Sequence, residues 1–290
     1  MMDPRIVLAE ILSDGISAFT PSQTHDALIV TEQAIFEGYD ELVEKLSPLL
    51  TDIEQQILEF RKAQLSNDAP LAQQCLTNAL KMSRTKGTRD HLLEARIRME
   101  WGILRASIGE FDDAGADLKW AVERLSAISK GHRWHGIALL NMAEWHRSRG
   151  EYGMALAVHA DISRHGPHLI EIISISRRRA AELLIEKDHI YSGLRNLWIA
   201  HHGFRQTNME EEAIEAGLHW IDLGLTEVSN QAPKMTAAIE QAAPRSAGEA
   251  KNRVWIHPTD LEIMRDWLYS RVDDDIANTV LADASQALQS

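Results

Sequence analysis

Four short segments of this chain can be superposed as turns between helices, and their regular spacing limits the possible folds more than any other feature of the sequence. The segments begin at Asn67, Gly109, Gly150 and Lys187, which places them 42, 41 and 37 residues apart. Between them, apolar residues recur at spacings of three and four, the period of an amphipathic helix. The pattern predicts a row of helical hairpins.

Residues at matched positions in the four copies support this prediction. Seven residues before the four segments stand Phe60, Gly102, Ala143 and Ala180, and twelve residues after their first positions stand Ala79, Ala121, Ile162 and Ile199. A single hairpin cannot bury its apolar faces, so successive hairpins must stack, and small side chains let neighbouring backbones approach. We therefore expect an all-α protein in which the hairpins stack as an α-solenoid.

Two of the turns resemble those of a known repeat family. Gly109-Glu110-Phe111 with Ala114, and Gly150-Glu151-Tyr152 with Ala155, are similar to the turn of the tetratricopeptide-repeat (TPR) family. The resemblance covers about residues 53–205 and implies a right-handed superhelix of helix pairs. The outer copies depart from the pattern, because Asn67 and Lys187 replace the turn glycine. The family period is about 34 residues, so a period near 40 implies a long-helix variant.

The sequence divides into three predicted parts. Residues 1–230 form the TPR-like domain, in which Glu37-Gly38-Tyr39-Asp40 indicates one further hairpin and Glu210–Ser229 is the last helix. Residues 231–258 are expected to form a short helix and a linker. Residues 259–290 are expected to form helices that cap the repeats, pair with a second chain as a homodimer contact, or occupy the binding groove. The isoleucine-rich segment 169–176 could be a strand, but it lacks a partner strand and is expected to be helical.

Composition excludes several classes of protein. A single cysteine, Cys75, cannot form an internal disulfide, so we expect a reducing compartment, the cytoplasm, and a buried apolar role for this thiol. No apolar window reaches the length of a membrane span, so no membrane partner is expected. The net charge of −13 opposes nucleic-acid binding, although residues 130–206 carry 11 Lys and Arg against 7 Asp and Glu.

No motif for a catalytic site or a cofactor is present, so the chain is predicted not to be an enzyme and to hold no cofactor. The pairs His132/His135 and His165/His168 have a spacing that could bind a metal on a helix, but they flank predicted helix ends, and we interpret them as solvated or capping residues rather than a metal site. An enzyme that uses these histidines remains a third hypothesis. Tryptophans recur across the repeats, and we expect most of them to pack between hairpins.

The resemblance implies that the first helix of each repeat lines a concave groove. On that face the sequence places Arg96, Met99, Ile103, Asn141, Glu144, Arg147, Ser148, Arg177 and Arg178. Arginine binds carboxylates through two parallel hydrogen bonds, and asparagine can bond a peptide backbone through a donor and an acceptor. We therefore expect a scaffold or adaptor that binds a protein or an acidic peptide. The alternatives are a solvated face, or a regulator in which a peptide or small signal fills the groove and shifts the C-terminal helices.

Overall fold

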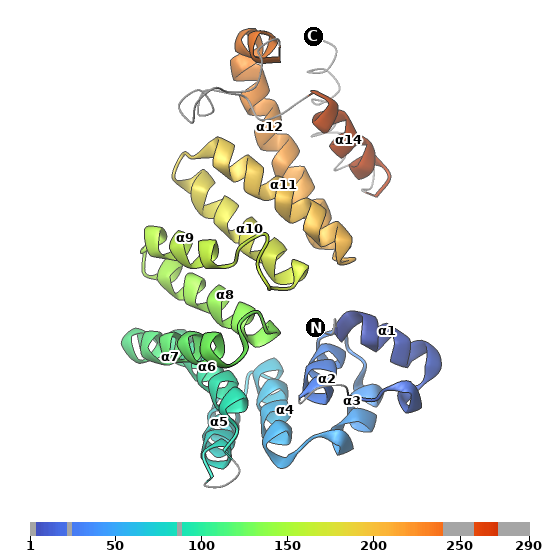
Figure 1. Cartoon of the computed structure of the whole chain (residues 1–290), viewed down its shortest axis with the longest axis vertical. Helices are drawn as coiled ribbons and strands as arrows, with labels where there is room; N and C mark the ends of the chain where they lie inside the picture. Colours follow the sequence, from blue (N-terminus) through green and yellow to red (C-terminus); the bar gives the residue numbers. More distant parts are fainter. Residues whose placement is uncertain (1–3, 22–24, 86–88, 240–257, 272–290) are drawn as a thin grey trace. The chain divides into compact units, whose positions relative to one another are not determined.

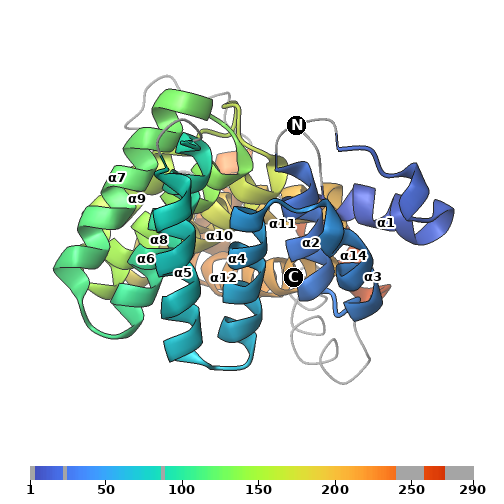
Figure 2. The ribbon, with the colours of Figure 1, turned by 90° about the horizontal axis from the view of Figure 1, so that it is seen from below.

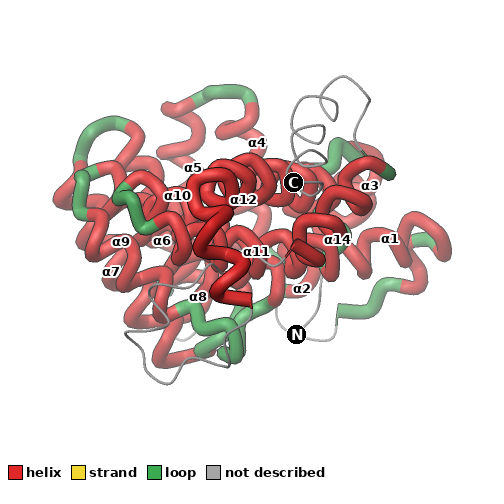
Figure 3. Tube along the Cα trace, turned by 90° about the horizontal axis from the view of Figure 1, so that it is seen from above, coloured by secondary structure: helices red, strands yellow, loops and turns green. Residues whose placement is uncertain are grey.

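The computed structural model describes residues 4–21, 25–85, 89–239 and 258–271. This part of the chain consists of helices joined by loops and contains no strand, which confirms the all-α prediction (Figure 3). The chain divides into two compact units, residues 1–145 and 146–290. No helix among the described residues is both long enough and apolar enough to cross a membrane.

The first unit is a series of helices that pack with their neighbours in the sequence. The helices are α1 (Pro4–Asp14), α2 (Asp26–Phe36), α3 (Asp40–Leu46), α4 (Asp52–Leu65), α5 (Ala69–Ser83), α6 (His91–Ser107), α7 (Phe111–Ser129) and α8 (Arg133–Ser148), with short 3-10 helices at Ile16–Ala18 and Ser47–Leu49. Helices α4 and α5 lie side by side as a hairpin, and so do α6 and α7 (Figures 1 and 2). Helix α2 also packs against α4. One apolar core runs through this unit, from Leu8 to Trp145.

Polar side chains fix where the helices of the first unit begin. Thr51 and Glu54 form a capping box at the start of α4, in which each side chain bonds the backbone N–H of the other residue. Asp90 accepts hydrogen bonds from the N–H groups of Leu92 and Leu93 at the start of α6. These caps satisfy N–H groups that a helix leaves without partners, and they fix the register of α4 and α6.

The second unit contains α9 (Tyr152–Asp161), α10 (Ile170–Glu186), α11 (Ile190–Gln206), α12 (Glu210–Ile239) and α14 (Pro258–Tyr269). Helix α10 packs along α11, and α11 packs along α12 (Figure 1). The segment at 169–176 is therefore largely the first part of α10, as expected from its lack of a partner strand. The core of this unit includes Leu194, Leu197, Trp220 and Ile221.

One turn conformation recurs along the chain. A residue with positive φ stands two positions before the next helix in six turns, at Gly38, Asn67, Gly109, Gly150, Asp188 and Asn208. In every case its N–H donates to the carbonyl three residues back, and the following N–H donates to the carbonyl five residues back, over 2.8–3.0 Å for the latter bond. This is the Schellman motif, which bonds carbonyls that the end of a helix leaves free.

The structure corrects the register of the fourth repeat. Its left-handed residue is Asp188, not Lys187, so the last spacing is 38 residues rather than 37. The matched positions become Ala181 and Ala200, both fully buried, in place of Ala180 and Ile199. Asn and Asp tolerate the left-handed conformation better than other residues that carry a Cβ, and this is why Asn67 and Asp188 can stand where glycine stands in other turns.

The hairpins depend on small residues at close helix crossings. A Cβ on Gly102 of α6 would lie 2.6 Å from Leu118 Cγ and 3.1 Å from the carbonyl oxygen of Ala114 on α7. A Cβ on Gly193 of α11 would lie 2.5 Å from Ile185 Cγ1 on α10. Glycine therefore stands at positions where the neighbouring helix leaves no room for a Cβ.

The C-terminal part differs in one respect from the expected boundaries. Helix α12 continues to Ile239 and passes through Pro233, so the segment expected to form a short helix is an extension of the preceding one. Helix α14 packs on α12, with Met264 and Leu268 buried and Trp267 against His201 of α11. The predicted linker between 240 and 257 and the acidic run at 273–275 lie outside the described residues.

Candidate functional site

Four charged side chains meet inside the first unit, and we refer to Glu32, Arg61, Arg96 and Glu100 as the Arg–Glu quartet. Glu32 comes from α2, Arg61 from α4, and the other two residues from α6. Glu32 Oε1 lies 3.3 Å from Arg61 Nη2 and 2.9 Å from Arg96 Nη2. Glu100 Oε1 lies 2.9 Å from Arg61 Nη2 and also pairs with Arg96. Each carboxylate thus contacts both arginines.

Burial makes these ion pairs strongly interdependent. The side chains of Arg96 and Glu100 are each 3% exposed. Burial alone would raise the pKa of Glu100, but the charges of Arg61 and Arg96 outweigh it, and the pKa is lowered. Burial alone would lower the pKa of Arg61, but the charges of Glu100 and Glu32 outweigh it, and the pKa is raised. The neighbouring charges therefore favour the ionised forms of Glu100 and Arg61.

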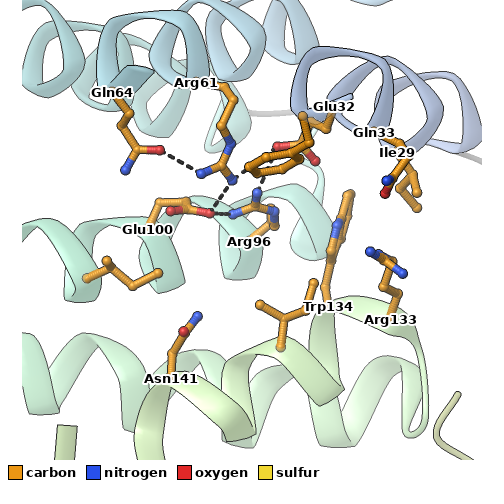
Figure 4. Close-up of a pocket in the computed structure, with 13 residues that line it drawn as sticks. Ile29, Glu32, Gln33, Arg61, Gln64, Arg96, Glu100, Arg133, Trp134 and Asn141 are labelled. Carbon is orange, nitrogen blue, oxygen red and sulfur yellow. Dashed lines mark hydrogen bonds and ion pairs between the residues drawn. The ribbon is translucent and has the colours of Figure 1, made fainter. Parts of the chain in front are cut away.

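The quartet forms one side of a cavity of about 260 Å³, which we call the quartet cavity. Figure 4 shows Asn141 and Trp134 projecting from α8 toward Arg96 and Glu100 on α6. The lining residues come from α2, α4, α6 and α8 and are Ile29, Glu32, Gln33, Phe36, Arg61, Gln64, Arg96, Glu100, Ile103, Arg133, Trp134, Ile137 and Asn141. The cavity therefore combines charged groups and carboxamides with an apolar wall.

Several polar atoms of the quartet have unused hydrogen-bonding capacity. Arg61 Nε, Arg96 Nε and Glu100 Oε2 are buried and lack a hydrogen-bond partner. Buried polar groups are nearly always bonded, and leaving one unbonded costs about 1–3 kcal/mol. A ligand, a buried water molecule or a rearrangement of the side chains can satisfy such groups.

Trp134 connects the quartet with a second buried charge cluster. Its ring lies 5.9 Å from the guanidinium carbon of Arg96 and 5.5 Å from the ring of His25. His25 Nδ1 bonds Glu54 Oε1 at 2.7 Å, and Nε2 lies 3.2 Å from Asp90 Oδ2. The tryptophan ring thus lies close to one cation from each cluster. Such an arrangement is favourable because the electron-rich face of an aromatic ring attracts cations.

His25 is a permanent cation near neutral pH. Burial would lower its pKa, but hydrogen bonds and charge interactions with Asp90 and Glu54 raise the pKa to about 9. The pKa values of Glu54 and Asp90 are lowered by their bonds to His25 and to backbone N–H groups, against the opposing effect of burial. This cluster ties the start of α2 to the capped ends of α4 and α6.

The structure brings some of the predicted groove residues together. Arg96, Ile103 and Asn141 all line the quartet cavity. Met99 is fully buried in the core, so it does not line a surface groove. Glu144 is half-buried on α8, one turn beyond Asn141. Three residues of the predicted face in the first unit therefore border one cavity.

The remaining predicted groove residues belong to the second unit. Arg147 and Ser148 are exposed at the end of α8, whose last three residues fall in this unit. Arg177 is half-buried and donates a hydrogen bond to the carbonyl of Ile162. Arg178 pairs with Glu215 at 2.6 Å and with Glu182 at 3.4 Å. Both arginines of α10 therefore make contacts within their own unit.

The histidine pairs contribute to local structure. His132 Nδ1 accepts a hydrogen bond from the N–H of Trp134, and His135 Nδ1 accepts one from the N–H of Gly131. His168 is buried and His165 is exposed. Among the described residues, no three His, Cys, Asp or Glu side chains gather in a way that could hold a metal ion. Cys75 is buried, as expected, and burial raises the pKa of its thiol.

Four residues of the site were not predicted from the sequence: Glu32, Arg61, Glu100 and Trp134. Two signals could have identified some of them. Glu32 interrupts a strongly apolar helix, where an acidic residue needs a buried partner, and Arg96 and Glu100 stand four residues apart on one helix. Arg61 carries no such local signal for an ion pair, because its carboxylate partners lie on α2 and α6. No family model and no curated protein matches this chain.

Proposed function

We propose that this chain is a non-enzymatic binding protein, a scaffold or adaptor, whose TPR-like hairpins stack as a right-handed solenoid and whose quartet cavity holds a peptide segment of a partner protein. The repeated Schellman turns and the buried small residues after them support the repeat architecture. The single buried cysteine fits the reducing conditions of the cytoplasm, where we place the protein.

The observation that carries the proposal is the quartet with its unmet donors and acceptor beside an apolar wall. Asn141, Gln33 and Gln64 place three carboxamides around the same cavity, and a carboxamide can both donate to and accept from a peptide backbone. Ile103, Ile137 and Trp134 offer contact to an apolar side chain. Such a combination of a few polar groups with apolar walls is typical of recognition sites.

The protonation states favour binding over acid–base catalysis. The lowered pKa of Glu100 keeps this carboxylate ionised, so it holds no proton to donate near neutral pH. An arginine stays charged at any pH at which a protein is folded, and in Arg61 the carboxylates of Glu100 and Glu32 raise the pKa further, against the opposing effect of burial. The groups of the quartet are therefore suited to hold a ligand.

A second candidate function is a ligand-responsive regulator. It is favoured by Trp134, which contacts both the quartet and the His25 cluster at the start of α2. A ligand against Trp134 would change contacts made by α2, α4, α6 and α8 together. If it bound two arrangements of these helices unequally, it would shift their populations.

A comparative pull-down tests the proposed function. The wild-type chain, Asn141→Asp and Arg178→Glu would each be incubated with cytosolic extract, and the captured peptides quantified. We expect Asn141→Asp to lose the specific partners, because it places a further negative charge beside Glu100, and Arg178→Glu to retain them. Equal capture by all three, or loss with Arg178→Glu alone, would contradict the location of the site. Thermal melting checks that each variant is folded.

A further inference from the structure

The quartet contains both donors and an acceptor that have no hydrogen-bond partner. Arg61 Nε and Arg96 Nε are N–H donors without an acceptor, and Glu100 Oε2 is an acceptor without a donor. A ligand with only an anionic group could satisfy the arginines but not the carboxylate, and a ligand with only a cationic group would do the reverse. A ligand with both groups matches both sets of atoms, which are covered in the structure and come within reach when their side chains turn toward it.

The carboxylate of Glu100 can turn toward such a ligand if one of its oxygens keeps the arginine contacts that Oε1 makes. Both arginines use its Oε1 atom, so Oε2 is left over. The terminal torsion of a glutamate side chain has a broad energy profile, and rotation about it can present Oε2 to the cavity. Asn141 faces this region from α8 and can donate to a carboxylate as well as accept from an ammonium group (Figure 4).

The size and walls of the cavity define the rest of the ligand. Its volume of about 260 Å³ lies just below the range of about 300–1,000 Å³ usual for sites that hold drug-sized molecules. The apolar part of its lining consists mainly of Ile103 on α6 and of Trp134 and Ile137 on α8. A compact molecule with one apolar side chain therefore suits the space better than a long polar one.

We infer that the quartet cavity takes a free amino acid with an apolar side chain, bound as the zwitterion. The ammonium group donates to Glu100, the carboxylate accepts from the arginine Nε–H groups and from Asn141, and the side chain packs against Ile103, Ile137 and Trp134. The inference rests on the proposed function in that both place the ligand in this cavity. It favours the regulator, because the ligand is a small signal.

Calorimetric titration of the full chain tests the charge requirement. The probes are L-leucine, N-acetyl-L-leucine, which lacks the positive charge, and L-leucinamide, which lacks the negative one. We expect L-leucine to bind and each blocked form to bind at least about tenfold more weakly, since each loses a charge-assisted hydrogen bond. Equal binding of either blocked form, or no binding of L-leucine at millimolar concentration, would overturn the inference.

A matched pair of variants tests the location. Asn141→Ala removes a carboxamide from the cavity, whereas Asn196→Ala removes one from α11, where Asn196 bonds the carbonyl of Ser192. We expect about tenfold weaker leucine binding only in the first variant, and equal binding by both would overturn the placement. If leucine fails to bind while partner capture still depends on Asn141, this inference fails and the proposed function stands. If capture is also independent of Asn141, both fail.

Discussion

Neutralising one member of the Arg–Glu quartet should destabilise the first unit strongly. In Glu100→Gln, two buried arginines would share Glu32 alone. At an effective dielectric constant of about 20, charges about 4 Å apart attract by about 4 kcal/mol, and breaking a buried pair typically costs about 3–5 kcal/mol. Since domains are stable by about 5–15 kcal/mol, this loss is a large fraction of the total. Urea denaturation followed by circular dichroism measures it.

Two further variants make this prediction specific. Glu59→Gln removes a half-exposed partner of Lys62 on α4, and should cost about 0–1 kcal/mol. The double variant Arg96→Met with Glu100→Leu removes one charge of each sign and should recover most of the loss, because no net charge stays buried. The reasoning would be refuted if Glu100→Gln cost no more than Glu59→Gln, or if the double variant were less stable than Glu100→Gln.

Three more predictions concern pH and packing. The pKa of His25 is raised from 6.5 to about 9 in the folded protein, which at about 1.4 kcal/mol per pKa unit stabilises the fold by roughly 3 kcal/mol. This stabilisation should be complete below pH 6.5 and lost as pH rises through 9. His25→Asn should abolish this dependence of the free energy of unfolding on pH, measured by urea titration. His201 has a pKa lowered to about 4, chiefly by burial, so its unit should lose stability as pH falls from 6.5 toward 4, and an unchanged slope in His201→Asn would contradict this. Gly102→Ala should destabilise the protein by about 1–3 kcal/mol, because the added methyl group would contact Leu118. Gly153→Ala has open space around it and should stabilise the protein by up to about 1 kcal/mol. Melting temperatures that move in the same direction in the two variants would contradict the assigned packing.

The turns, the hairpins and the close helix crossing at Gly102 could be predicted from the sequence because each depends on residues close together in the chain. Gly109 and Gly150 mark their turns directly, since glycine adopts positive φ without strain. Asp188 was harder to identify, because its left-handed conformation is an option for aspartate rather than a requirement. The helix period, the hairpins and the close crossing at Gly102 all follow from patterns within one repeat.

The site could be predicted only in part because it depends on packing between helices far apart in sequence. Arg96, Ile103 and Asn141 lie on the expected faces of their helices and reach the same cavity. Met99 shares the face of Arg96, yet neighbouring helices cover it completely. Arg61 enters the site from α4 through contacts that no spacing within one helix reveals.

If the quartet cavity is a ligand site, the Nε–H signals of its arginines should respond to a bound ligand. Nitrogen-15 spectra of the full chain would be recorded while L-leucine, and separately a pool of tryptic peptides from cytosolic protein, is added. We expect the Nε–H signals of Arg61 and Arg96, assigned from single Arg→Lys variants, to shift with at least one of the two probes, and that of Arg178 to stay unchanged. Unchanged signals from both cavity arginines with both probes would contradict a ligand site in the quartet cavity.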